Sequence, residues 1–187
     1  MTGLDPTALL EVFMQRASAL GVRVERVVDS RASVPEIQLE AQVAASSRLV
    51  VSAELCRRAP DLIGALGERL AVETATDAAG VRDAALALSF AHAAYAETGS
   101  VLLAEPNLAD RSVGMLSRTL IVVVETLALR SGLDDAVAQL RTIANRPGGG
   151  YATVMTGPSR TADIERVLTV GVQGPGRVVV LFVDALT

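Results

Sequence analysis

The chain of 187 residues contains no lysine, so all 17 of its basic residues are arginine. A lysine forms the Schiff base of pyridoxal-phosphate enzymes and binds phosphate in the P-loop of many nucleotide hydrolases. Both classes are therefore excluded for this chain. The net charge is −4, and no basic cluster is larger than the pair Arg57-Arg58. We expect no nucleic-acid partner, because neutralising phosphates requires a basic face.

Cysteine and histidine are almost as scarce, since Cys56 and His92 each occur alone. One cysteine excludes a disulfide within the chain and an iron–sulfur cluster ligated by this chain by itself. A zinc site built on histidine and cysteine is not expected either, and no glycine-rich dinucleotide fingerprint occurs. We therefore expect this chain to bind no cofactor, and we interpret Cys56 as a packing residue rather than a nucleophile.

Long apolar runs and a basic leader segment are also absent. No run reaches the roughly 18 apolar residues of a membrane span, and the N-terminal segment lacks a secretory pattern. We expect no membrane span and a cytoplasmic location. Aromatic residues make up only 3% of the chain although half of it is hydrophobic, so the core should consist of Ala, Val, Leu and Ile. A single domain over residues 1–187 is the default expectation.

Strand-like and helical segments alternate along the chain. Leu120–Val124 is the clearest buried strand, because its consecutive apolar residues are mostly β-branched and show no polar alternation. Asp5-Pro6 predicts the start of a helix that Gly21 ends. Ser33–Glu36 has the pattern of a capping box that opens another helix. Further strands are expected at 22–28, 49–51, 70–73, 101–104, 151–155 and 178–183, and a further helix at 60–66. The alternation predicts an α/β layered domain around a largely parallel sheet.

Other segments are harder to assign. Alanine content and periodicity in residues 77–97 favour one long helix, and Glu105–Ser112 has the composition of a polar loop. A helix is expected from Asp134 onward. It carries an apolar stripe made of Leu133, Val137, Leu140 and Ala144.

The densest polar chemistry lies in residues 155–165, which follow a strand-like run. Gly157-Pro158 breaks the strand, and the hydroxyl residues that follow can cap a short helix. Free N–H groups at such a turn, together with Arg160, can form a binding site for a carboxylate or a phosphate. The alternative is a capped turn in which Arg160 pairs with Asp163 or Glu165 and binds nothing.

The run Gly157–Glu165 (GPSRTADIE), followed by Gly171–Pro175 (GVQGP) and an apolar strand, resembles the C-terminal signature of the LUD domain, the lactate-utilisation protein C family. Upstream, Ala96–Ser100 (AETGS) resembles the second motif of that family. This chain departs from the pattern at Gln173, where the family usually has histidine, and glutamine cannot exchange a proton near neutral pH. A proline that often precedes the central strand is also replaced, around Ser117.

The resemblance implies the fold shared by sugar-phosphate isomerases and CoA transferases, here a single three-layer α/β/α domain. It also implies a helix to about Ala85, a strand near residues 86–89 and a helical turn before Glu97, which we adopt in place of one long helix. In function, it implies participation in oxidising L-lactate to pyruvate alongside iron–sulfur subunits.

Glu97 is the catalytic candidate, because a carboxylate beside hydroxyl groups and a glycine can act as base or nucleophile. The alternative is an exposed turn acid that accepts a bond from a neighbouring N–H. Arg160 can clamp a carboxylate through two hydrogen bonds. Because the Gly157 turn follows a strand, we expect it at the carboxyl ends of the sheet, where open α/β sheets bind ligands. The predicted ligand-binding residues are Thr98, Gly99, Ser100, Gly157, Pro158, Ser159, Arg160, Thr161, Asp163, Gln173 and Gly174.

We interpret the chain as a small-carboxylate-binding or assembly subunit similar to lactate-utilisation protein C. Its expected partners are a small anion, either carboxylate or phosphate, and separate iron–sulfur protein subunits. One alternative is a stand-alone transferase- or ligase-like enzyme acting on an acyl, CoA or phosphorylated substrate, with Glu97 catalytic. Another is a purely structural subunit of a complex. A homo-oligomer is compatible with each of these readings.

Overall fold

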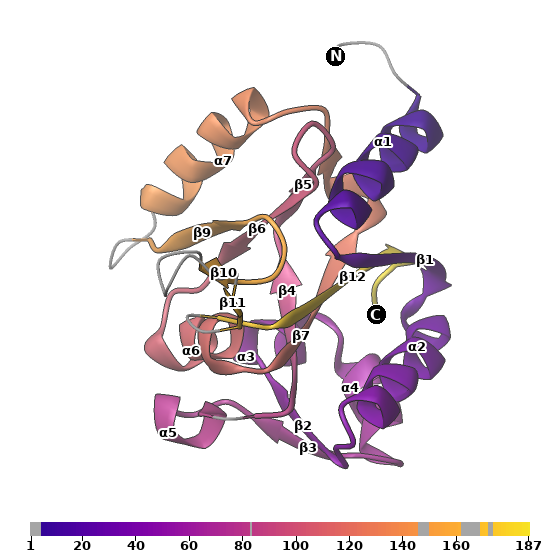
Figure 1. Cartoon of the computed structure of the whole chain (residues 1–187), viewed down its shortest axis with the longest axis vertical. Helices are drawn as coiled ribbons and strands as arrows, with labels where there is room; N and C mark the ends of the chain where they lie inside the picture. The colour runs from indigo at the N-terminus through magenta and orange to yellow at the C-terminus, as the bar shows by residue number, and fades with distance from the viewer. Residues whose placement is uncertain (1–4, 83, 146–149, 162–168, 172–173) are drawn as a thin grey trace.

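The core of the fold is a six-stranded, fully parallel sheet with the strand order β1-β12-β7-β4-β2-β3 (Figure 1). The computed structural model describes residues 5–82, 84–145, 150–161, 169–171 and 174–187. The strands of this main sheet are β1 (Arg23–Asp29), β2 (Arg48–Val51), β3 (Ala71–Thr74), β4 (Leu86–Ala91), β7 (Thr119–Glu125) and β12 (Arg177–Ala185). The expected α/β class with a largely parallel sheet is confirmed.

Strand β7 lies in the middle of the main sheet and is buried on both faces, as its apolar run predicts. Ile121 and Val123 belong to the core on one face, whereas Leu120, Val122 and Val124 belong to the core on the other. Alternation along a strand sends successive side chains to opposite faces. A strand with apolar residues at every position is therefore stable only between two layers.

One face of the main sheet is covered by helices α2 (Ser30–Val43), α3 (Ala53–Arg58) and α4 (Pro60–Gly67). Helix α2 begins earlier than expected, because Asp29 caps it by accepting a hydrogen bond from the N–H of Ala32 at 2.8 Å. The prediction that Ser33–Glu36 opens this helix is therefore wrong. Pro35 lies inside the helix, and the Glu36 side chain bonds Arg23 instead of capping.

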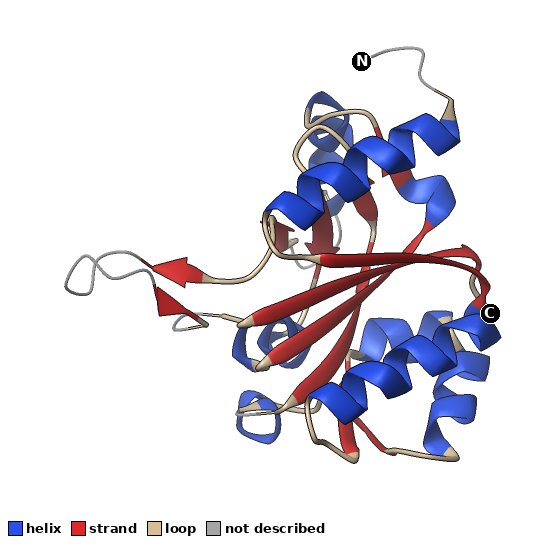
Figure 2. Cartoon of the chain, turned by 45° about the vertical axis from the view of Figure 1, so that its right-hand side comes forward, coloured by secondary structure: helices blue, strands red, loops and turns tan. Residues whose placement is uncertain are grey.

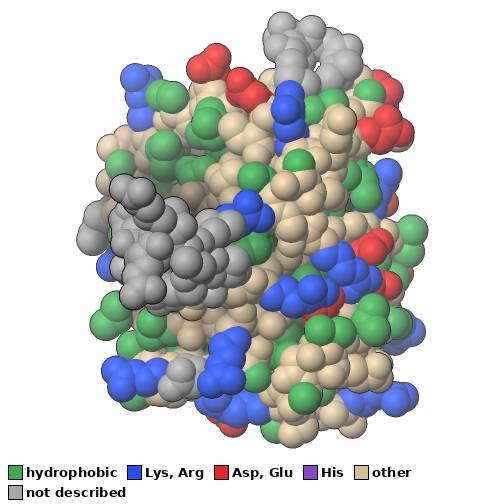
Figure 3. Space-filling model, viewed as in Figure 1, with side chains coloured by type: hydrophobic (Ala, Val, Ile, Leu, Met, Phe, Trp, Pro, Cys, Tyr) green, Lys and Arg blue, Asp and Glu red, His purple; other side chains and the backbone are tan. Residues whose placement is uncertain are grey.

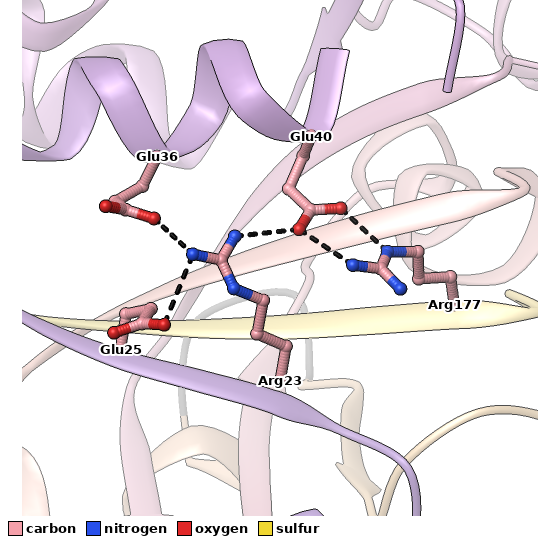
Figure 4. A network of polar contacts seen from close by, with 5 residues as sticks. All are labelled: Arg23, Glu25, Glu36, Glu40 and Arg177. Carbon is pink, nitrogen blue, oxygen red and sulfur yellow. Dashed lines mark hydrogen bonds and ion pairs between the residues drawn. The ribbon is translucent and has the colours of Figure 1, made fainter. Parts of the chain in front are cut away.

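A network of charged side chains around the buried Glu40 fastens α2 to the main sheet (Figure 4). The Glu40 carboxylate is 1% exposed and accepts bonds from Arg177 at 2.7 and 2.9 Å and from Arg23 at 2.9 Å. Arg23 also contacts Glu25 and Glu36. The hydrogen bonds from Arg177 and Arg23 outweigh the cost of burial and lower the pKa of Glu40. The amino ends of β1 and β12 are thereby joined to one helix.

The opposite face carries α1 (Pro6–Ala19), α5 (Ala78–Val81), α6 (Leu108–Leu116) and a second, mixed sheet with the order β8-β5-β6-β9 (Figures 1 and 2). Helix α1 starts at Asp5-Pro6 and ends before Gly21, as predicted. The strands of the mixed sheet are β5 (Ala93–Tyr95), β6 (Ser100–Ala104), β8 (Leu129–Arg130) and β9 (Ala152–Met155). The short helix η1 (Thr126–Ala128) connects β7 to β8.

Two local predictions are wrong in this layer. Ala93–Tyr95 is a strand rather than a helical turn, because it pairs with β6 on one side and with β8 on the other. Residues 105–112 do not form a polar loop throughout, since α6 begins at Leu108. Asn107 caps this helix by accepting a hydrogen bond from the N–H of Asp110 at 2.8 Å, and Val113 packs into the core.

Helix α7 (Asp134–Ala144) covers the outer face of the mixed sheet, and hydrophobic side chains gather on the surface above it (Figure 3). The helix packs through Ala136 and Ile143, whereas its stripe of larger apolar residues is exposed. Strands β10 (Arg160–Thr161) and β11 (Thr169–Val170) form a ribbon that projects beyond the main sheet (Figure 2). Within the described residues, no helix has the length and apolar character needed to cross a membrane.

Candidate functional site

The two motif segments lie side by side in the structure. Strands β6 and β9 are antiparallel neighbours with Val101 opposite Met155, so the residues that flank this pair also meet. The hydroxyl groups of Ser100 and Thr156 are 2.6 Å apart. Ser100 closes the turn between β5 and β6, and Thr156 leads into the Gly157 turn.

The two motif glycines pack against the C-terminal end of α1 and the segment that follows it. Gly99 has φ +66°, and a Cβ atom there would lie 2.6 Å from the backbone nitrogen of Ala17. Gly157 has φ +89° and lies against Leu20 and Val22. A positive φ strains residues with a side chain, so these positions require glycine both for backbone conformation and, at Gly99, for close approach.

The two glycine-proline turns are bonded to each other. The N–H of Ser159 donates to the carbonyl oxygen of Pro175 at 2.9 Å, and the N–H of Gly171 donates to the carbonyl oxygen of Ser159 at 2.9 Å. A Cβ atom on Gly174 would lie 3.2 Å from the Cβ of Ser159. The predicted residues Ser159 and Gly174 therefore lie together, and Pro158 directly precedes Ser159 in its turn.

Arg160 is exposed and donates through Nη2 to the carbonyl oxygen of Leu20 at 2.5 Å. Leu20 is the C-cap of α1, and a cation there is favourable because helix carbonyls without partners carry partial negative charge. This contact is a structural role for Arg160. Asp163 and Gln173 lie outside the described residues, as does Glu165, the alternative partner of Arg160. Of Thr161 the structure describes the backbone, which pairs with Thr169.

Within the described chain, Glu97 contacts the segment before α7 and not the Gly157 turn. Its carboxylate oxygen Oε2 accepts a hydrogen bond from the N–H of Leu133 at 3.2 Å, and a Cβ atom on Gly132 would lie 2.6 Å from it. Its own N–H donates to the carbonyl oxygen of Ser131. The carboxylate thus faces the segment before α7, as an exposed turn acid would. The adjacent Thr98 hydroxyl is shielded and has no hydrogen-bond partner among the described residues.

The expected position of the Gly157 turn relative to the main sheet is wrong. The turn contacts Leu20 and Val22, which precede β1, and it bonds Pro175, which precedes β12. It therefore lies at the amino ends of these strands. The error arose because β9, which leads into the turn, belongs to the mixed sheet and not to the parallel one.

At the carboxyl ends of the main sheet, the structure assembles polar groups that sequence reasoning missed. The chain runs outward from β2 to β3 and returns to β4, which makes the β2–β4 boundary a switch point where open α/β sheets bind ligands. Glu54 follows β2, His92 follows β4, and their Oε1 and Nε2 atoms are 3.7 Å apart. Burial opposes ionisation of Glu54, but its bonds to Arg58 and Arg57 prevail and lower its pKa.

Two buried carboxyl groups adjoin this boundary. Asp110 is fully buried and accepts hydrogen bonds from the N–H of Ala53 at 2.7 Å and from Asn107 at 3.0 Å. Glu105 is 4% exposed, and its Oε1 has no hydrogen-bond partner within the described chain. Burial, and next the charge of Asp110, raises the pKa of Glu105 to about 7, although Arg111 opposes the shift. Such a carboxyl can exchange a proton at neutral pH. Nothing in the local sequence distinguishes Glu105 from an exposed acid.

The sequence profile of the LUD domain family matches residues 68–183, which include both motif segments. The chain belongs to the LUD domain family. Among the described residues of this LUD protein, no three His, Cys, Asp or Glu side chains lie together as a metal site. The family match covers His92, Glu105 and Asp110, whereas α1 and Glu54 lie before it.

Similar proteins include lactate utilization protein C from Shouchella clausii, 32% identical over 98 residues, which are 52% of this chain and 43% of that protein. Lactate utilization protein C from Halalkalibacterium halodurans is 33% identical over 120 residues, or 63% of this chain and 49% of that protein. The matches thus span less than half the length of these relatives. The crystal structure of a DUF162 family protein from Deinococcus radiodurans has the same fold, with a TM-score of 0.63, 21% identity and coverage of 97% of this chain and 99% of that one.

Proposed function

We propose that this LUD protein takes part in the oxidation of L-lactate to pyruvate together with separate iron–sulfur subunits. Its own contribution is to bind a small carboxylate or to hold the complex together. The observation that carries the proposal is the direct contact of the two family motifs through Ser100 and Thr156, inside the region that matches the family. The names of the similar proteins refer to lactate utilization, and the resemblance of the motifs to that family implies the oxidation of L-lactate to pyruvate.

Electron transfer must then lie with the partner subunits. Lactate gives up electrons when it becomes pyruvate, and an iron–sulfur cluster that accepts them is normally held by four cysteine thiolates. This chain has only Cys56. A division of labour follows, in which partners carry the clusters and this chain presents the substrate or the docking surface.

The carboxylate-binding role places the substrate beside Arg160. Its contact with Leu20 uses Nη2, and a guanidinium has five N–H donors in all. A carboxylate can therefore bind the exposed edge without breaking the contact to α1. Glu97 has its contacts at the start of α7 and does not compete for Arg160.

The experiment combines ligand titration with recovery of the complex. L-Lactate, pyruvate and inorganic phosphate are titrated in a thermal-shift assay against the purified chain, Arg160→Ala, and Arg82→Ala as a matched exposed arginine. In parallel, the tagged chain is recovered from its native host and its partners are analysed for iron. A shift that Arg160→Ala abolishes and Arg82→Ala retains supports substrate binding. A stable iron-containing complex without any shift supports the assembly role. Neither a shift nor an iron-containing partner would refute the proposal.

A further inference from the structure

A pocket of about 450 Å³ lies at the carboxyl ends of β1, β12 and β7, between the start of α1 and η1. This volume is within the roughly 300–1,000 Å³ range of small-molecule sites, and open α/β sheets bind ligands at this edge. The pocket is separate from the Gly157 turn, which meets the amino ends of β1 and β12. Most of its lining comes from residues outside the family match.

One wall of the pocket is an oriented ion pair between neighbouring strands. Arg26 on β1 donates through Nε to Oδ1 of Asp184 at 2.9 Å and through Nη2 to Oδ2 at 3.0 Å. These side chains share the face of Val24 and Phe182, which belongs to the core beneath α1. The pair fixes the plane of the guanidinium. The Nη1 group of Arg26 has no hydrogen-bond partner within the described chain, so its N–H donors are available.

The other walls are apolar. Pro6 and Leu9 contribute from α1, Leu129 from β8, and Leu127 from η1. Leu127 is 86% exposed, the highest value among the large hydrophobic side chains of the described chain. Exposed apolar surface beside a cavity is favourable for binding, because a ligand that covers it removes that surface from water. The pocket thus joins one cation, one anion and an apolar wall.

We propose that this pocket binds a zwitterionic small molecule with an apolar side chain, the chemistry of an apolar α-amino acid. The ligand carboxylate accepts from Nη1 of Arg26, its ammonium donates to Asp184, and its side chain packs on Leu9, Leu127 and Leu129. Thr126 also lines the pocket.

Charge complementarity favours a zwitterion over a plain carboxylate or a plain amine. A plain carboxylate would place a second anion beside Asp184, and a plain amine would place a second cation beside Arg26. A zwitterion meets each charge with its opposite, so no like charges are brought together. The inference is independent of lactate chemistry and does not rest on the proposed function.

The first part of the test compares ligands by isothermal titration calorimetry with the purified chain. L-Leucine and L-phenylalanine are the probes, 4-methylpentanoate lacks the ammonium, isopentylamine lacks the carboxylate, and glycine lacks the apolar group. We expect the two amino acids to bind and each of the three comparison compounds to bind about tenfold more weakly or worse. Equal binding of the acid or the amine would overturn the zwitterion assignment, and no binding of either amino acid would overturn the site.

The second part uses variants with a matched control. Asp184→Asn and Arg26→Gln should each weaken L-leucine binding about tenfold, and Leu127→Ser should weaken it about fivefold. All three positions are partly or largely exposed, so we expect these variants to fold. The control is Arg48→Gln, because Arg48 and Glu73 form a similar ion pair, at 2.8 Å, on the neighbouring strands β2 and β3. Unchanged binding in Asp184→Asn and Leu127→Ser, or an equal loss in Arg48→Gln, would overturn the proposal.

Discussion

Glu105→Gln should become more stable than the wild type as pH rises from acidic to alkaline values. The Glu105 side chain is buried at the end of β6, and its Oε1 lies 3.1 Å from the position of a Cβ on Gly114 of α6. Glutamine has nearly the shape of a protonated glutamate but never ionises. The substitution therefore removes a buried titration and leaves the packing almost intact.

The sign and size follow from the raised pKa. Burial raises the pKa of Glu105 from 4.5 to about 7, so between these values the folded protein holds a proton that the unfolded chain has released. Stability falls with rising pH wherever the folded state binds more protons. The loss begins above pH 4.5 and is complete above pH 7. A shift of this size corresponds to about 3 kcal/mol, or roughly 6–12 °C in the midpoint of thermal unfolding.

The assay is urea unfolding at intervals from pH 4.5 to pH 8.5 for wild type, Glu105→Gln and Glu11→Gln. Glu11 is an exposed residue of α1 and serves as control for removing one charge. The difference between Glu105→Gln and wild type should grow in favour of the variant by about 3 kcal/mol as pH rises. A difference that stays flat across this range, or one that Glu11→Gln reproduces, would refute the reasoning that Glu105 is buried without a compensating partner.

Three further predictions test other parts of the structure. Glu40→Gln should lower the free energy of unfolding by roughly 1.5–3 kcal/mol at pH 7, because Arg23 and Arg177 lose their charged hydrogen bonds to the shared carboxylate while both arginines stay partly solvated. The deficit should shrink at acidic pH, since the lowered pKa of Glu40 makes its contribution disappear as pH falls. An unchanged urea midpoint would contradict this. Ile121→Asp should destabilise the fold by several kcal/mol, because it buries a carboxylate without a partner in β7; a folded variant with an unchanged thermal midpoint would place this strand at the surface. Elemental analysis and absorption spectroscopy of the purified chain should find no stoichiometric iron, zinc or flavin, and about one metal ion or flavin per chain would refute that expectation.

Much of the main sheet could be predicted from sequence because local composition and final burial agree there. The run Leu120–Val124 and the segment that became β12 are apolar at successive positions, which suits only strands covered on both faces. Helix α1 was equally clear, since Asp5-Pro6 and Gly21 act within a few residues of the helix ends. In each case the signal and its structural consequence lie in the same short segment.

The mixed sheet could not be predicted in the same way. Ala93–Tyr95 is rich in alanine, which favours helix, yet it becomes a strand because β6 and β8 provide hydrogen-bond partners on both sides. Helix α7 shows the same limit. Its periodicity correctly predicts an amphipathic helix, but the smaller Ala136 and the single Ile143 face the sheet, while the leucine stripe remains exposed.

By itself, the sequence determined which chemistries this chain lacks, the parallel core and the family motifs, because these depend on residue identity and on patterns within short segments. The tertiary structure alone decided where the motif residues point. Arg160 contacts Leu20, which is 140 positions away, Glu97 contacts the segment before α7, and Glu105 is buried next to Asp110. A pKa or a hydrogen-bond partner depends on the dielectric and the charges around a group. Those surroundings come from segments distant in sequence, so they exist only after the layers have packed.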